Sequence, residues 1–149
     1  MNIKFRKATE KDLPGFIALC NECFEENTTI NKASRIFNKY KNDKNHIYVV
    51  GILDKQIVAC AKITIIPTMF EHMATYAILN HICVKPEYRR HQIATKLLDY
   101  ISKLCKQQKC KNMSLWSLNF RIPAHACYKN YGFEVLDAKF FNKSIKEEK

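Results

Sequence analysis

The chain has 149 residues, of which 47% are hydrophobic and 26% are charged, so disordered and fibrous classes are excluded and one folded domain over residues 1–149 is expected. Lys and Arg outnumber Asp and Glu by 25 to 14, and the net charge of +11 favours anionic partners, either a phosphate-rich cofactor or a nucleic acid. No apolar run is long enough to cross a membrane and the segment MNIKFRKATEKD is too charged for a signal peptide, so we expect a cytoplasmic protein without a membrane partner.

The first third of the chain predicts a strand and two helices. Residues 2–8 alternate as a strand does, and Thr9 followed by Asp12 is typical of a helix N-cap with an acidic third position. Apolar side chains recur at three- and four-residue spacing over residues 13–25, which predicts a helix. A shorter helix is expected over residues 32–40.

The middle of the chain predicts a hairpin and a central strand. Residues 46–53 and 56–66 are rich in β-branched and apolar residues, and the pair Asp54-Lys55 between them is turn-like. Residues 76–85 are almost continuously apolar, as expected of a strand covered on both faces, and this strand ends at Pro86. A long helix is expected over residues 93–109.

The last part of the chain predicts a strand over residues 112–118 and a helix over 123–131, which Gly132 ends. Residues 133–135 and 139–144 are expected to close the sheet as a final hairpin. Strands and helices therefore alternate in an α/β (α+β) layout with a mixed sheet.

Seven cysteines form an odd set without two paired C-x-x-C units, although Cys20 and Cys23 are separated by two residues. Most of them stand among apolar residues. We therefore expect reduced, buried thiols and no metal site, with a metal site or a disulfide as the less favoured alternatives. The basic residues are spread along the chain without interleaved aromatic residues, which disfavours binding to nucleic acid.

The most informative stretch is residues 82–98, ICVKPEYRRHQIATKLL, where a buried strand ends, a basic loop follows and a long helix begins. The first N–H groups of a helix lack intrahelical partners and carry partial positive charge, so anions bind there. Arg89, Arg90 and His91 add donors that suit a pyrophosphate. An ordinary solvent-exposed loop between a strand and a helix is the alternative interpretation of the same pattern.

This stretch resembles the GNAT superfamily of N-acetyltransferases, in which a strand leads into a loop of the form (Q/R)xxGx(G/A) that holds the pyrophosphate of coenzyme A. The present loop, Arg89-Arg90-His91-Gln92-Ile93-Ala94, matches the first and last positions and has Gln92 in place of the usual glycine. It is similar in this respect to aminoalkylphosphonate N-acetyltransferases. IKFRKATEKDLPGFIALC resembles the first strand and helix of the superfamily, and RIPAHACYKNYGFE resembles its last motif.

The resemblance implies the acyl-CoA N-acyltransferase fold, with a mixed, mostly antiparallel sheet of six to seven strands flanked by about four helices. It also implies an enzyme that transfers an acetyl group from acetyl-CoA to a primary amine of a small molecule or peptide, by direct attack in a ternary complex. A ping-pong route through Cys83 or Cys127 is disfavoured because no His/Asp relay accompanies them at motif spacing. A homodimer through the last strands or a helix face is left open.

The resemblance assigns roles to single residues. The central strand is expected to lie beside the pantetheine arm, and the following loop and helix start to hold the pyrophosphate. The expected cofactor-binding residues are Ile82, Cys83, Val84, Arg89, Arg90, His91, Gln92, Ile93, Ala94, Thr95, Asn119 and His125. Tyr128, at the tyrosine position of the last motif, is expected to protonate the leaving thiolate as general acid.

A general base is harder to assign. Family members often use a carboxylate on the central strand, where this chain has Asn80 and His81. His81 can accept a proton near neutral pH, whereas Asn80 can only orient a water. Glu71 and His72 are weaker alternatives. Each assignment competes with a purely structural role. His81 could be a core histidine, and Tyr128 could be a packed aromatic residue. Asn119 and His125 could cap a helix or lie on the surface.

Two further questions stay open in the sequence. Gln92 and the missing carboxylate are compatible with a GNAT-shaped module that binds coenzyme A without catalysis. The basic balance favours an acceptor with phosphate, phosphonate or carboxylate groups, whereas the glutamates at positions 22, 25 and 26 suit a cationic polyamine or aminoglycoside. Residues 24–30, Phe37 and residues 68–73 are the expected acceptor lining.

Overall fold

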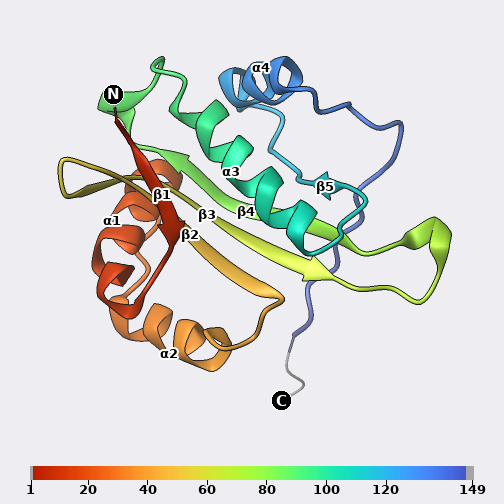
Figure 1. Cartoon of the computed structure of the whole chain (residues 1–149), viewed down its shortest axis with the longest axis horizontal. Coiled ribbons are helices and arrows are strands. Elements are labelled where there is room, and N and C mark those ends of the chain that lie inside the picture. Colours follow the sequence, from red (N-terminus) through yellow and green to blue (C-terminus); the bar gives the residue numbers. More distant parts are fainter. Residues whose placement is uncertain (1, 147–149) are drawn as a thin grey trace. The chain divides into compact units, whose positions relative to one another are not determined.

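A computed structural model describes residues 2–146, and the chain divides into two compact units, residues 1–116 and 117–149, which are described separately (Figure 1). The first unit contains a five-stranded sheet in the order β1-β2-β3-β4-β5. Its strands are β1 (Lys4–Lys7), β2 (His46–Leu53), β3 (Gln56–Ile66), β4 (Tyr76–Val84) and β5 (Met113–Ser114). Its helices are α1 (Leu13–Phe24), α2 (Ile30–Tyr40) and α3 (Ile93–Gln107), and the second unit contains α4 (Ile122–Tyr131). No helix in residues 2–146 is long and apolar enough to span a bilayer.

The sheet is mixed and mostly antiparallel. The strands from β1 to β4 pair antiparallel in chain order, and β5 pairs parallel with β4. Val49 and Val50 are neighbours in β2 and both are fully buried. Because successive side chains of a strand point to opposite faces, both faces of the sheet must be covered.

Different helices cover the sheet. Phe16 and Leu19 of α1 pack with Val50 and Cys60 in one core cluster. The helix α3 contacts β3 and β4. Its apolar side is buried, through Ile93, Leu97, Leu98 and Ile101. The 3.6-residue period recognised in the sequence therefore marks the face that α3 buries.

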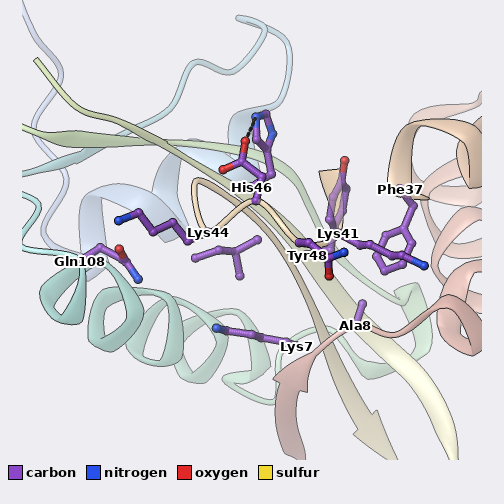
Figure 2. A pocket seen from close by; sticks show the side chains of 11 residues that line it. Lys7, Ala8, Phe37, Lys41, Lys44, His46, Tyr48 and Gln108 are labelled. Carbon is purple, nitrogen blue, oxygen red and sulfur yellow. Dashed lines mark ion pairs between the residues drawn. The ribbon is translucent and has the colours of Figure 1, made fainter. Parts of the chain in front are cut away.

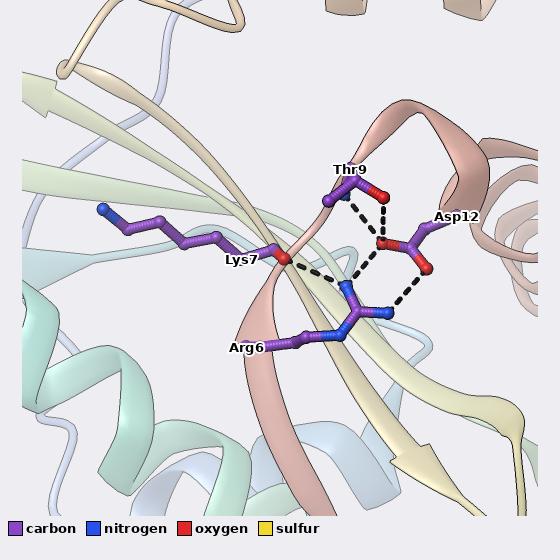
Figure 3. Close-up of polar contacts among 4 residues, drawn as sticks. All are labelled: Arg6, Lys7, Thr9 and Asp12. Atoms are coloured by element: carbon purple, nitrogen blue, oxygen red, sulfur yellow. Dashed lines mark hydrogen bonds and ion pairs between the residues drawn. The ribbon is translucent and has the colours of Figure 1, made fainter.

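The turn between β1 and α1 is fixed by an acidic side chain (Figure 3). The backbone N–H of Thr9 donates to Asp12 Oδ2 at 2.7 Å, the reach-back bond of a capping box, as the Thr9/Asp12 spacing predicted. The guanidinium of Arg6 donates to both carboxylate oxygens of Asp12, at 2.6 and 2.9 Å. This bidentate pair holds the pKa of Asp12 below its usual value, first through the hydrogen bond from Arg6 and then through that from Thr9, against the effect of burial.

The predicted elements from β2 to α3 are confirmed within two residues. Asp54 and Lys55 form the two-residue turn of the β2–β3 hairpin with φ values of 49° and 65°, the left-handed conformation that a tight hairpin requires. The α2 helix begins earlier than expected, at Ile30, because the Thr29 side chain accepts the N–H of Lys32 as an N-cap.

Two sequence predictions were wrong. The strand expected over residues 112–118 is only two residues long, and residues 133–135 and 139–144 form no strand, so residues 2–146 contain a five-stranded sheet rather than one of six to seven strands. Alternating apolar residues do not make a strand unless another strand offers ladder hydrogen bonds. The fold class and the four helices are confirmed.

Candidate active site

The junction between β4 and α3 leaves donors unused at the start of a helix. Arg90 and Gln92 both have left-handed backbones, with φ of 66° and 61°, and Gln92 is the residue that precedes α3. The N–H of Lys96 donates to the Gln92 carbonyl and closes the first helical turn. The preceding N–H groups, of Ile93, Ala94 and Thr95, therefore have no acceptor inside the helix, and the side chain of Gln92 does not cap it.

The arginine that opens this loop holds it to the end of β4. Arg89 Nε donates to the carbonyl of Val84 at 3.1 Å, and its Nη2 lies 3.7 Å from Cys23 Sγ in α1. Arg90 and His91 are exposed and bring positive charge or donors to the same loop. Arg89 therefore has a structural contact as well as charge, while Arg90 and His91 are the more accessible groups.

β4 has an open edge next to this loop. Its pairing with β5 is confined to Ala77↔Met113 and Ile78↔Ser114, so residues 79–84 have no strand partner on that side in the part of the chain that the structure describes. Ile82, Cys83 and Val84 lie in this stretch. An unpaired strand edge presents N–H and C=O groups at the spacing of a neighbouring strand, which suits an extended ligand with amide groups.

A β-bulge interrupts β4 just before these residues. Cys83 pairs with Cys60 and Asn80 pairs with Lys62, so His81 and Ile82 together stand opposite the single residue Ala61. His81 has φ of 55°. One extra residue in a strand re-aims the side chains around it, and bulges are common next to active sites.

The bulge brings Asn80 and His81 to one face of the sheet, although they are consecutive. The His81 ring meets the Phe16 ring of α1 edge to face at 6.5 Å. Asn80 stands opposite Lys62, whose Nζ lies 5.6 Å from the centre of the Tyr48 ring, and that ring also contacts Phe16. His81 is exposed, so it is not a core histidine.

Sequence reasoning missed Lys62 and Tyr48. Lys62 is half-buried, and burial lowers its pKa. Burial also raises the pKa of Tyr48, with a smaller contribution from Tyr40. A signal was present, because Lys62 is the one charged residue in the apolar run QIVACAKITII of β3. The weaker base candidates, Glu71 and His72, lie exposed in a 3-10 turn before β4.

The second unit carries the other predicted residues. Tyr128 is half-buried in α4, and its ring meets Phe133 edge to face at 5.7 Å. The Tyr128 carbonyl accepts the N–H groups of Gly132 and Phe133, which ends the helix as the glycine predicted. His125 also lies in α4 and Asn119 in the turn before it. Their expected roles, like that of Tyr128, stay predictions.

Two hollows of the first unit lie outside the predicted site. One, of about 210 Å³, is bordered by Lys7, Lys44, His46 and Gln108 (Figure 2). The other, of about 580 Å³, lies between α1 and the β2–β3 turn. Neither is lined by a predicted catalytic or cofactor-binding residue, but Phe37 of the expected acceptor lining borders the first and Glu22 borders the second. The unpaired edge of β4 is a different kind of feature, a row of backbone groups rather than an enclosed space.

The family model described as the acetyltransferase (GNAT) family matches residues 13–133. This chain belongs to that family. The acetyltransferase therefore depends on acetyl-CoA, and the resemblance seen in its three sequence motifs is confirmed at the level of the family. No curated protein sequence matches the chain significantly.

Solved structures share the fold at low sequence identity. A transcriptional regulator from Bacillus halodurans C-125 is 20% identical with a TM-score of 0.86, over 97% of this chain and 100% of that one. An aminoglycoside antibiotic 6'-N-acetyltransferase from Acinetobacter baumannii is 21% identical with a TM-score of 0.80, over 97% and 100%. Glucosamine-6-phosphate N-acetyltransferase from Arabidopsis thaliana is 20% identical with a TM-score of 0.78, over 100% and 98%.

The acetyltransferase has groups that fit acetyl-CoA. The unused N–H groups that begin α3, together with Arg90 and His91, suit a pyrophosphate, and the open edge of β4 suits the amide-bearing pantetheine arm. Gln92 takes the left-handed conformation for which the usual glycine is suited. The replacement of that glycine therefore costs some backbone strain.

Proposed function

We propose that this acetyltransferase transfers the acetyl group of acetyl-CoA directly to a primary amine of a small molecule or peptide within a ternary complex. The observation that supports this most is the His81 bulge, because it presents two polar side chains beside the open edge of β4. A protein that only bound coenzyme A would need the open edge of β4 and the start of α3, but not the exposed imidazole of His81.

Each residue of the proposed site has one task. Acetyl-CoA supplies an activated thioester carbonyl. The backbone of Ile82–Val84 aligns the pantetheine arm, and the N–H groups of residues 93–95 hold the pyrophosphate. The His81 imidazole accepts a proton from the acceptor amine, directly or through a water that the Asn80 amide orients. The Tyr128 hydroxyl returns a proton to the departing sulfur.

The acceptor is proposed to carry an anionic group as well as its amine. Lys62 stands opposite Asn80 and is half-buried, and within residues 2–146 no carboxylate lies at ion-pair distance from it. A phosphate, phosphonate or carboxylate of the acceptor would compensate that buried charge, while a polycationic acceptor would be repelled by it. Of the acceptors after which the similar enzymes are named, glucosamine 6-phosphate fits this charge and an aminoglycoside does not.

A panel of amines tests the proposal. Purified protein is incubated with acetyl-CoA and one acceptor at a time, and release of free coenzyme A thiol is followed. The panel holds glucosamine 6-phosphate, an aminoalkylphosphonate, glucosamine, a polyamine, an aminoglycoside and a lysine peptide. We expect thiol release with a phosphate- or phosphonate-bearing amine, and much less with the neutral sugar amine.

Two other outcomes would contradict this. Faster release with the aminoglycoside or polyamine would overturn the anionic acceptor but leave acetyl transfer intact. A melting shift with acetyl-CoA but no thiol release with any amine class would favour the non-catalytic, coenzyme-A-binding module.

A further inference from the structure

Three cysteines that are far apart in the sequence meet between α1 and the sheet. Cys20 lies on α1, Cys60 on β3 and Cys83 on β4. The Sγ atoms of Cys20 and Cys60 are 3.6 Å apart, those of Cys20 and Cys83 are 4.0 Å apart, and all three lie within 4.8 Å of one another. All three are free thiols.

These separations are those of sulfur atoms that share one metal ion. With a metal–sulfur bond of about 2.3 Å, two thiolates of a tetrahedral site lie about 3.8 Å apart, and two of a trigonal site about 4.0 Å apart. Thiolates select soft ions such as Zn²⁺ and Cu⁺ over hard ions.

The surroundings supply a nearby positive charge and a route of entry. Cys23 lies one helical turn after Cys20, outside the group of three sulfur atoms, and its Sγ donates to the Val84 carbonyl at 3.7 Å. Its Sγ is 3.7 Å from Arg89 Nη2, and a guanidinium there favours negatively charged sulfur. Cys60 and Cys83 are buried, whereas Cys20 and Cys23 are only partly so, which leaves a route from the surface.

We propose that Cys20, Cys60 and Cys83 form a three-sulfur binding site for a soft d¹⁰ metal ion. Binding replaces each S–H bond by a sulfur–metal bond and releases those protons to solvent, without oxidation or reduction. The bound ion ties α1 to β3 and β4, next to the His81 carbonyl, which already accepts a bond from Cys60 Sγ at 3.4 Å.

Direct metal binding tests the site without any measurement of acetyl transfer. The full-length protein is purified with reductant and chelator, the chelator is removed, and Cd²⁺, Zn²⁺ or Cu⁺ is added alone. Cd²⁺ reports thiolate ligation through its sulfur-to-metal charge-transfer absorption, and native mass spectrometry gives the stoichiometry. We expect one ion per chain, a raised melting temperature, and slower alkylation of Cys20, the one partly exposed cysteine of the three.

Variants then assign the ligands. Cys20→Ala, on a partly exposed helix position, is expected to lower the affinity for Zn²⁺ and Cu⁺ by about 100-fold or more, because losing a ligand costs at least as much as losing a group that orients one. Cys23→Ala removes a thiol that lies outside the group of three sulfur atoms, and it is expected to lower the affinity for either ion less than Cys20→Ala does. Cys127→Ala, in the second unit, is the matched control and should bind as the wild type does.

The alkylation experiment uses the unmodified chain, so the test does not depend on a variant folding. The proposal is overturned if the wild type takes up no stoichiometric ion of the three, or if Cys127→Ala weakens binding as much as Cys20→Ala. It is also overturned if Cys20 is alkylated after metal addition at its metal-free rate. None of these outcomes bears on acetyl transfer, so the metal site and the enzyme can fail independently.

Discussion

Lys62 of β3 lies directly opposite Asn80 of β4, at the last regular pair before the sheet bulges at His81. Residues directly opposite each other in an antiparallel pair share a face, so the lysine and the amide stand together on the side covered by α1. A charge, an amide and an imidazole are thus gathered on one face of β3 and β4. The predictions below begin with this group.

Lys62→Met is expected to lower kcat/KM for a phosphate-bearing acceptor by about 10- to 100-fold, since a hydrogen bond between charged groups contributes about 1.5–3 kcal/mol. The methionine keeps most of the volume of the alkyl chain. Steady-state kinetics with glucosamine 6-phosphate and glucosamine provide the measurement. Lys103→Met, on the exposed side of α3, serves as the control. An equal loss with the neutral amine would mean that Lys62 does not hold the anion.

His81→Asn is expected to lower turnover by about 100-fold or more, because a general base contributes that much. The binding of acetyl-CoA should not weaken. Asparagine tolerates the left-handed backbone of the bulge, so the strand should keep its course. Turnover is measured at saturating acetyl-CoA, whose affinity is checked by calorimetry. His72→Asn, in the exposed 3-10 turn before β4, is the comparison. If the two variants turn over equally fast, the base lies elsewhere.

Tyr128→Phe is expected to reduce turnover by about 100-fold or more while the KM for acetyl-CoA stays near the wild-type value. Phenylalanine keeps the edge-to-face contact with Phe133 and removes only the hydroxyl. Tyr131→Phe, three residues later in α4, is the matched control. Wild-type turnover in the Tyr128 variant would leave the tyrosine a packing role only.

Gln92→Gly is expected to raise the free energy of unfolding by about 0.5–1 kcal/mol, because a left-handed backbone is strained for glutamine and open to glycine. It should also tighten acetyl-CoA binding, since the loop gains the glycine usual in the family. Lys109→Gly relieves the same strain beyond the other end of α3, at φ of 61°. Urea unfolding should show higher stability for both variants. Calorimetry should show tighter binding of acetyl-CoA for Gln92→Gly alone. Weaker binding by Gln92→Gly would assign the amide side chain itself to the cofactor.

Asp12→Asn is expected to cost about 1–2 kcal/mol of unfolding free energy at neutral pH, a value reduced from that of a buried pair because Arg6 is partly exposed. The pKa of Asp12 is lower in the folded chain than its usual 3.8. Its stabilising contribution is therefore complete above pH 3.8 and disappears as the pH falls through the folded value. Urea unfolding over a pH series should show the two proteins converge in acid. If the difference in unfolding free energy between the two proteins stays constant with pH, the carboxylate of Asp12 is not its cause.

Local patterns in the sequence were sufficient for most elements. The apolar period of α3, the turn residues Asp54 and Lys55 and the glycine stop of α4 each depend on neighbours within a few positions. The loop from Arg89 to Ala94 was recognised for the same reason, since a strand end, a basic loop and a helix start are contiguous. Asn80 and His81 were found as polar residues of a central strand.

What the sequence by itself determined, then, is the succession of helices and strands, the family and the helix start that suits a phosphate, because short-range periodicity and motif spacing encode them. The tertiary structure decided the rest: the bulge that turns Asn80 and His81 to one face, the place of Lys62 opposite Asn80, the meeting of Cys20, Cys60 and Cys83, and the absence of strands in residues 133–144. Each of these depends on the register between separate helices and strands, or on whether a pairing partner exists. The residues near a side chain in the sequence do not reveal which residue will face it across a sheet.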